Sequence, residues 1–233
     1  MKQVTCMVQA RLASERVKHK MIRPFADSCL LEIALKKLQS CDFLDQDRLY
    51  LSAYDPEIKA VGKKLGVQVY NRTYESTLEP NTMDVLYQYL DDIESEYILE
   101  INPCNPMLEA ATINKALQVF QENDYSSLFS VVERRNFFFD EESKMLNNFL
   151  GDKKYIPTLE TNMVGPIYEA AHCIYLWRAE RVKLERVRWS LTKNDPFLFE
   201  ITPEEAFDID FPWQFELGEY AYIQRYGKAN NEK

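Results

Sequence analysis

The chain has 233 residues, of which 46% are hydrophobic and 28% charged, and its 37 acidic residues outnumber the 28 basic ones for a net charge of −9. This composition is typical of a folded globular protein and excludes a disordered chain. No apolar stretch reaches the roughly 18 residues of a membrane span, so we expect no membrane association. The acidic balance argues against nucleic acid as a partner, because contacts from Lys and Arg to phosphates supply most of that affinity.

The five cysteines are scattered, odd in number and without a C-x-x-C pair: Cys6, Cys29, Cys41, Cys104 and Cys173. They predict reduced thiols in a cytoplasmic protein and not a disulfide framework. The apolar segment near the N-terminus is short, and no cleavage site follows it. We therefore expect no secretory signal.

The first half of the chain alternates strand-like and helix-like segments. Strands are predicted at 2–8, 48–53, 67–70 and 97–101, and helices at 30–38, 55–65, 81–93 and 110–123. Apolar residues repeat at helical spacing in 30–38, Pro56 opens the second helix, and Asn81 or Thr82 caps the third. This alternation predicts an α/β fold, a doubly wound and mostly parallel sheet with crossover helices.

The second half is less regular. Strands are predicted at 127–133, 173–176 and 197–201, and Pro212 leads a closing helix over 211–226. Residues 140–159 have mixed charge and weak periodicity, so the region of about 137–165 is the candidate for an excursion or a dimerisation arm. No linker, repeat or low-complexity tract divides the chain, which predicts a single domain over 1–233, frayed at 227–233.

A basic loop follows the first predicted strand, where ligands of open parallel sheets bind. It carries Arg11, Arg16, Lys18, His19 and Lys20 within ten residues of an acidic chain. Backbone N–H groups, the Ser14 hydroxyl and these cations suit a polyphosphate. The alternative interpretation is a solvated basic loop without a ligand. The position of the loop directly after the strand favours the anion site.

Two carboxylates are spaced for a metal ion near the C-terminus. In an extended segment, residues two apart project to the same face, so Asp208 and Asp210 lie together while Ile209 points to the core. Such a pair beside phosphates suits Mg²⁺, because phosphate and water oxygens complete its coordination. Alternatively, Asp210 caps the closing helix.

The loop also resembles a known family. Residues 9–22, QARLASERVKHKMI, resemble the opening of the acylneuraminate cytidylyltransferases and their relatives in spore-coat and surface polysaccharide synthesis. The segments NTMDV (81–85), INPCNPM (101–107) and FDIDFP (207–212) resemble that family's helix start, sugar-side turn and closing motif. The likeness covers most of the chain and is thin over 137–159.

This resemblance implies CMP transfer from CTP to a sugar, with an acidic nonulosonate-like acceptor, release of pyrophosphate, and a homodimer. The nucleotide-binding positions it implies are Ala10, Arg11, Ser14, Arg16, Lys20, Arg72 and Thr82. It also assigns Asn102 and Asn105 to the sugar, Asp208 and Asp210 to Mg²⁺, and Arg11, Lys20 and Asp210 to catalysis.

The chain departs from the family at several of these places. Leu12 and Ala13 replace two glycines that let phosphate approach the backbone, and Glu15 adds a carboxylate beside them. On the sugar side, Asn102 replaces Gln and Leu108 replaces Arg. These changes leave open a non-catalytic member that binds nucleotide or a partner enzyme. A nucleotide-sugar-dependent glycosyltransferase is a further alternative, although the basic loop suits a free triphosphate better.

Two other residues receive a structural interpretation. His172 lies beside an apolar strand, which predicts a hydrogen-bonded histidine in the core or at a pocket edge and not a catalytic base. Cys104 lies in the sugar-side turn with nothing nearby in sequence to lower its pKa, so we expect no nucleophile there.

Overall fold

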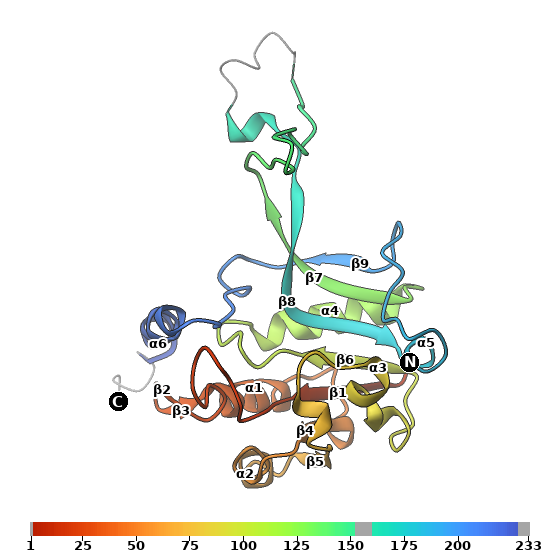
Figure 1. Cartoon of the computed structure of the whole chain (residues 1–233), viewed down its shortest axis with the longest axis vertical. Helices are drawn as coiled ribbons and strands as arrows, with labels where there is room; N and C mark the ends of the chain where they lie inside the picture. The colour runs from red at the N-terminus through yellow and green to blue at the C-terminus, as the bar shows by residue number, and fades with distance from the viewer. Residues whose placement is uncertain (1, 152–159, 228–233) are drawn as a thin grey trace.

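A seven-stranded sheet forms the centre of the computed structural model, which describes residues 2–151 and 160–227 (Figure 1). Across the sheet the strands are β5 (Gln68–Asn71), β4 (Leu49–Ala53), β1 (Val4–Gln9), β6 (Tyr97–Ile101), β8 (Ile167–Arg178), β7 (Ser127–Arg134) and β9 (Phe197–Glu200). Of these seven, β8 alone runs against its neighbours, β6 and β7. The mostly parallel α/β sheet predicted from the sequence is confirmed.

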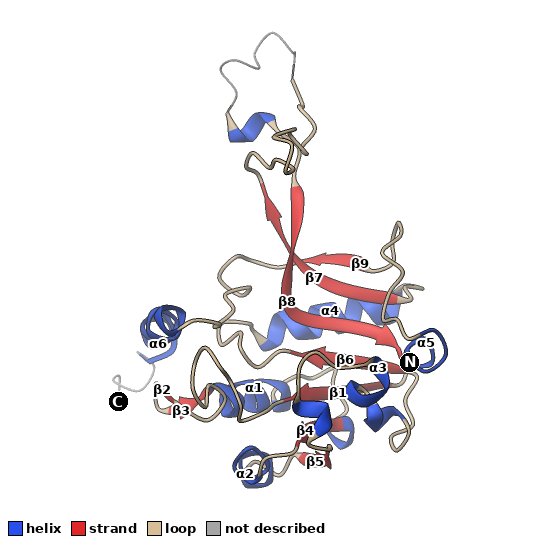
Figure 2. Cartoon of the chain, in the orientation of Figure 1, coloured by secondary structure: helices blue, strands red, loops and turns tan. Residues whose placement is uncertain are grey.

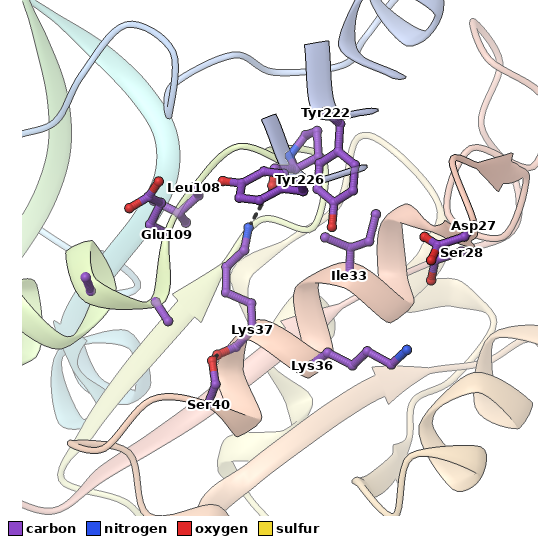
Figure 3. A pocket seen from close by; sticks show the side chains of 13 residues that line it. Asp27, Ser28, Ile33, Lys36, Lys37, Ser40, Leu108, Glu109, Tyr222 and Tyr226 are labelled. Atoms are coloured by element: carbon purple, nitrogen blue, oxygen red, sulfur yellow. Dashed lines mark hydrogen bonds between the residues drawn. The ribbon is translucent and has the colours of Figure 1, made fainter. Parts of the chain in front are cut away.

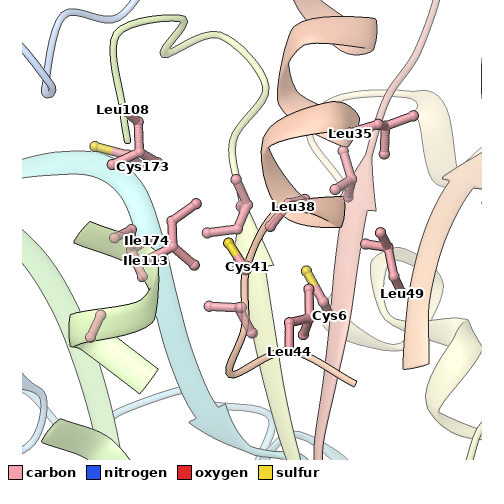
Figure 4. Packing of buried hydrophobic residues seen from close by; sticks show 14 of the residues in the cluster. Cys6, Leu35, Leu38, Cys41, Leu44, Leu49, Leu108, Ile113, Cys173 and Ile174 are labelled. Atoms are coloured by element: carbon pink, nitrogen blue, oxygen red, sulfur yellow. The ribbon is translucent and has the colours of Figure 1, made fainter. Parts of the chain in front are cut away.

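Helices cover both faces of this sheet, as a doubly wound fold requires (Figure 2). The larger core packs α1 (Leu30–Gln39), α2 (Pro56–Lys64) and α4 (Ala110–Glu122) on one face. Figure 4 shows part of it, with Leu38 and Cys41 near Cys6 of β1. On the other face, Met7 of β1 packs with the segment of α3 (Met83–Leu86) and with α5 (Ala179–Glu185).

The closing helix α6 (Pro212–Tyr226) begins at the predicted proline. It packs on the small hairpin of β2 (Pro24–Phe25) and β3 (Ser28–Cys29), where the rings of Phe25 and Phe215 lie 5.2 Å apart. Gly218 allows a close approach, because a Cβ there would lie 3.0 Å from Ile209 Cδ1. The helix therefore seats directly on the segment that carries the two predicted metal-binding carboxylates.

The helix predicted over 81–93 is wrong in its length. The structure has a single turn, α3, followed by a break at Tyr87 and a 3-10 turn over Gln88–Leu90. Tyr87 and Tyr89 are both buried in the same cluster, with Tyr87 5.1 Å from the ring of Trp177. Residues two apart cannot share one face of an α-helix, so burying both tyrosines breaks it.

Strands β7 and β8 continue outside the sheet as a two-stranded arm (Figure 1). Pairing extends from Val131 opposite Ala170 to Arg134 opposite Ile167, so β8 is twelve residues long where the sequence predicted 173–176. The segment predicted as an excursion lies at the end of this arm, and its residues 152–159 are outside the described residues. The prediction of fraying over 227–233 likewise falls outside them, apart from Gly227.

All five cysteines are buried and unpaired. No helix in the described ranges is long and apolar enough to cross a membrane.

Asp195 anchors the segment between α5 and β9. Its carboxylate accepts hydrogen bonds from the Ser190 amide at 2.9 Å and from the Ser127 hydroxyl, and forms an ion pair with Arg181 at 2.7 Å. Burial raises the pKa of Asp195, but these donors outweigh it and lower the pKa to about 2. The folded state therefore favours the charged carboxylate.

We expect Asp195→Asn to lower the free energy of unfolding by about 1 to 2 kcal/mol at pH 7. Because the folded pKa is depressed, this contribution is present above the unfolded value near 4 and disappears as pH falls to about 2. Urea unfolding at pH 7, 4 and 2.5 measures it, with the exposed Asp42→Asn as control. An Asp195→Asn deficit that is independent of pH would contradict the assignment.

Candidate active site

The loop after β1 is shaped by backbone contacts to β4 and to the start of α2. The Ala10 amide donates to Ser52 O at 3.1 Å, and the Leu12 amide donates to Asp55 Oδ2 at 2.7 Å. Ala10 is buried, and Ser14 lies partly exposed further along the loop. The carboxyl ends of β1, β4 and β5 meet here, since Gln9 pairs with Ser52 and Ala53 with Asn71.

Two arginines converge on the 3-10 turn Glu75–Thr77. Arg11 donates to Thr77 O at 2.6 Å and pairs with Glu79 at 2.9 Å. The buried Arg72 donates to Ser76 Oγ at 2.7 Å and also to the Ser76 carbonyl. Burial and then the charge of Arg11 lower the pKa of Arg72. Two neighbouring guanidinium groups make this corner suited to an anion.

Thr82 lies at the N-cap of α3, the position that the sequence predicted for it or Asn81. Neither the Thr82 hydroxyl nor the Asn81 side-chain amide caps the helix. Asn81 Nδ2 donates instead to Glu75 O at 2.7 Å. This bond connects the start of α3 to the turn that the two arginines bind. The structure thus brings Arg11, Arg72 and the Thr82 region to one corner.

A second cluster of cations surrounds Asp210. Lys20 is 7% exposed, and its ammonium donates to Ile209 O at 2.5 Å and to Asp210 Oδ1 at 3.3 Å. Arg16 reaches the same carboxylate oxygen at 3.0 Å. Burial lowers the pKa of Lys20, but the Cys104 thiol and then Asp210 outweigh it, so the net shift is upward. Lys20 therefore carries its charge near neutral pH.

The segment 208–210 is held by its central residue. Ile209 is fully buried; its amide donates to Cys104 O at 3.1 Å, and its carbonyl accepts from Lys20. Asp210 does not cap α6, so that alternative is wrong: Phe211 is the N-cap, and Gln214 Oε1 accepts the Asp210 and Phe211 amides, each at 2.8 Å. Neither carboxylate is therefore used as the cap of α6, and the partners of Asp210 are Arg16 and Lys20.

The Asp208 carboxylate is partly buried without full hydrogen bonding. Its Oδ1 is buried and finds no hydrogen-bond partner among the residues that the structure describes. Burial, and then repulsion from Asp210, raise the pKa of Asp208. A buried carboxylate oxygen without a donor is what a cation would satisfy. The residues therefore fit Mg²⁺ through two carboxylates, although the described part of the chain has no cluster of three or more His, Cys, Asp or Glu.

The two asparagines of the predicted sugar side have different surroundings. Asn102 is partly exposed, donates from Nδ2 to His172 O at 3.0 Å, and accepts the Cys104 amide at 3.0 Å. Asn105 is 2% exposed, and its Nδ2 donates to Ala206 O at 3.4 Å. Asn102 therefore borders the site, whereas the side chain of Asn105 points into the protein and connects the turn to the segment before Asp208.

Sequence reasoning missed Glu100, a carboxylate inside the site on β6. Its Oε1 accepts from Gln9 at 3.3 Å, and its Oε2 lies 3.4 Å from Arg188. Gln9 also accepts from Arg72 at 3.1 Å, so the corner formed by Arg11 and Arg72 is connected to Glu100. Burial raises the pKa of Glu100, and Arg188 opposes that shift. The signal was a single charge in an otherwise apolar strand, YILEI.

An aromatic wall, defined here as Phe129, Tyr175 and Trp189, continues from Glu100. The Phe129 ring stacks on Tyr175 at 5.0 Å and on Trp189 at 5.1 Å, and the Arg188 guanidinium lies 4.3 Å over Trp189. His172 is exposed at its edge, with Nδ1 2.8 Å from the Tyr175 hydroxyl. His172 is therefore hydrogen-bonded, as predicted, but it lies exposed at the edge of the aromatic wall and not in the core.

Cys104 fits the structural interpretation given to it. It is buried, and burial raises its pKa to about 11 despite the nearby Lys20. Its thiol is therefore not ionised near neutral pH.

Comparison with known proteins gives matches over most of the chain. A family model described as Cytidylyltransferase matches residues 5–226. The chain is 26% identical over 215 residues to an uncharacterized protein of Methanocaldococcus jannaschii, covering 87% of this chain and 84% of that one. It is 23% identical over 237 residues to N-acylneuraminate cytidylyltransferase B of Danio rerio, covering 97% of this chain and 53% of the relative. It thus spans about half the length of that enzyme.

Among solved structures, the chain is similar to CMP:2-keto-3-deoxy-manno-octonic acid synthetase complexed with CTP. The TM-score is 0.70 at 12% sequence identity, and the match covers 96% of this chain and 99% of the other. At this identity the likeness shows the fold, which is that of the nucleotide-diphospho-sugar transferases.

The two carboxylates should respond oppositely to loss of charge. Because its folded pKa is raised, charged Asp208 destabilises the fold, so Asp208→Asn should raise the free energy of unfolding by about 1 kcal/mol at pH 7. This gain should vanish below the unfolded pKa near 4, where both forms are neutral. Asp210→Asn should lower stability by about 1 kcal/mol, because buried Lys20 loses its partner.

Urea unfolding of both variants at pH 7 and pH 3.5 measures this difference, with Asp42→Asn as an exposed control. Equal effects of the two substitutions would mean that Asp208 has no excess electrostatic cost.

Proposed function

The chain belongs to the cytidylyltransferase family, and from that premise we propose that it transfers the CMP group of CTP to a hydroxyl of an acidic sugar, with release of pyrophosphate. The observation that carries the proposal is the buried Asp208 oxygen, which has no partner among the described residues, next to Asp210 with its partners Lys20 and Arg16. We further propose that the product serves surface polysaccharide synthesis in the cytoplasm, as the sequence resemblance implies.

The phosphates of CTP would lie between the loop after β1 and Asp210. In-line attack on the α-phosphate expels pyrophosphate, and the protein contributes mainly position and charge. Bound to Asp208 and Asp210, Mg²⁺ would polarise the α-phosphate and lower the pKa of the attacking hydroxyl. Arg16 and Lys20, which pair with Asp210 in the free protein, would then neutralise phosphate oxygens.

The nucleotide corner would hold the remainder of CTP. Arg11 and Arg72 supply fixed positive charge there, Ala10 and Ser14 line the loop, and Thr82 begins α3 beside them. Arg72 is restrained by Ser76 and Gln9, so its side chain loses little conformational entropy when a ligand binds it.

The sugar would contact Asn102 and the aromatic wall. Asn102 is held by two backbone groups, which orients its amide before the acceptor binds. Asn105 would act through the turn, since its own side chain is buried. Arg188, stacked on Trp189 and 27% exposed in its side chain, is a cation on this side of the site.

One observation favours the alternative of nucleotide binding without turnover. The Leu12 amide, at a position where the resembled family commonly has glycine, already donates a hydrogen bond to the Asp55 carboxylate. Phosphate binding would then depend on side-chain cations and on the other amides of the loop.

The test is nucleotide binding followed by product formation. We expect CTP with Mg²⁺ to raise the melting temperature, and UTP, ATP and GTP to raise it less, because ligands that bind the native state stabilise it. A panel of acidic sugars should then yield one that releases pyrophosphate. Asp210→Ala should lower that rate by about 100-fold or more while retaining the fold, and Asp42→Ala should not.

Binding of CTP without pyrophosphate release from any sugar would favour the non-catalytic alternative. Release of a nucleoside diphosphate from a nucleotide-sugar would favour a glycosyltransferase. Full activity of Asp210→Ala would refute the metal assignment.

We also propose that the arm forms a homodimer contact. Its Phe139, Leu146 and Leu150 are exposed apolar residues. Leu146→Asp with Leu150→Asp should convert a dimer to a monomer, measured by sedimentation velocity, because a buried interface does not tolerate unpaired carboxylates. Leu191→Asp, exposed and away from the arm, is the control. A monomeric wild type would exclude the proposal.

A further inference from the structure

Lys37 lies in the last turn of α1, and its side chain contacts the Asn105–Pro106 turn of the candidate active site. Its ammonium donates to Pro106 O at 3.0 Å and to Asn105 O at 3.4 Å. Within the described residues, its hydrogen-bond partners are these two carbonyl oxygens, and no carboxylate pairs with it. The neighbouring Lys36, in contrast, is exposed and pairs with Glu32 at 2.8 Å.

The turn that Lys37 holds is connected to both halves of the site. On one side, Asn102 accepts the Cys104 amide and donates to His172 O. On the other, Cys104 O accepts the Ile209 amide at 3.1 Å, between the two carboxylates. Asn105 adds a third connection through Ala206 O. A shift of the turn would therefore move the Asp208–Asp210 segment.

Lys37 lines a groove of about 620 Å³ between α1, the start of α4 and α6 (Figure 3). Burial lowers the pKa of Lys37 to about 8, opposed by Cys173, Glu205, Cys41 and Glu109 in that order. Glu205 and Glu109 already have partners: Glu205 accepts the Glu109 amide at 3.2 Å, and Glu109 pairs with Arg225. These neighbours therefore offset the effect of burial on the Lys37 pKa only in part.

We propose that Lys37 is a positioning residue for the metal-binding carboxylates, holding the Asn105–Pro106 turn and, through Cys104 O, the Ile209 amide between Asp208 and Asp210. Hydrogen bonds from a charged donor are roughly twice as strong as neutral ones, so proton loss from Lys37 weakens both. The metal segment is then looser in alkaline solution. The link to a metal ion rests on the proposed function, whereas the link to Ile209 does not.

The first test measures hydrogen exchange at the Ile209 amide. Its rate relative to the Ile98 amide in β6 is taken within each sample, which removes the intrinsic dependence on pH. We expect Lys37→Met to speed Ile209 exchange about tenfold at pH 7, and Lys36→Met to leave it unchanged. Wild type should lose about threefold of its relative protection between pH 7 and 9, and Lys37→Arg, which stays charged, should not.

Protection at Ile209 that is unchanged in Lys37→Met, or lost equally with pH in wild type and Lys37→Arg, would overturn the proposal. A fall in the melting temperature of Lys37→Arg would show that Arg does not fit at this position. The proposal is then tested by the comparison of Lys37→Met with Lys36→Met and by the wild-type pH series.

The second test uses Mn²⁺ as the probe, titrated in the presence of CTP. We expect Lys37→Met to weaken Mn²⁺ about tenfold at pH 7 while leaving CTP affinity without metal unchanged. No Mn²⁺ binding to wild type would count against the proposed function alone, since the exchange result stands apart from it. Normal Mn²⁺ binding to both proteins would overturn the positioning role.

Discussion

The whole site depends on how one buried residue, Ile209, is fixed at its backbone. Its amide is bound by Cys104 O, its carbonyl by the Lys20 ammonium, and its side chain lies in the core with Phe215 of α6. Asp208 and Asp210 flank it, and the charges of both carboxylates raise the pKa of Lys20. The loop after β1, the turn after β6 and the closing helix, far apart in sequence, thus meet at a single residue.

The site has two carboxylates, Asp208 and Asp210, and two nearby cations, Lys20 and Arg16, but both cations pair with the same carboxylate. Asp210 has two cationic partners, whereas Asp208 has an oxygen with none in the described structure. The electrostatic cost of burying negative charge therefore falls mainly on Asp208, where a bound cation would reduce it. Burial also raises the pKa of Glu100, although that carboxylate has partners at 3.3 to 3.4 Å.

Much of this was readable from the sequence because it depends on local pattern. Strand–helix alternation predicts the sheet, and the basic loop and the D-I-D spacing predict the cations and carboxylates around Ile209. The break at Tyr87 was not predictable, because its cause is packing against Trp177, ninety residues away. The arm part of β8, YEAAH, is exposed or half-exposed over most of its length, so it lacks the alternation that marks a strand. Arg188 meets Glu100 only through the fold.

The long strand β8 has a mechanical consequence. One continuous chain segment begins in the arm at Ile167, passes the irregularity where His172 has φ +52, and ends behind the aromatic wall at Arg178. His172 is fixed at this point by two hydrogen bonds, one from the Asn102 side chain to its carbonyl and one between its ring and the Tyr175 hydroxyl. A contact made by the arm would therefore be transmitted along β8 to Asn102 and Tyr175, which border the candidate site. An arm held in place would restrain the positions of these two residues as well.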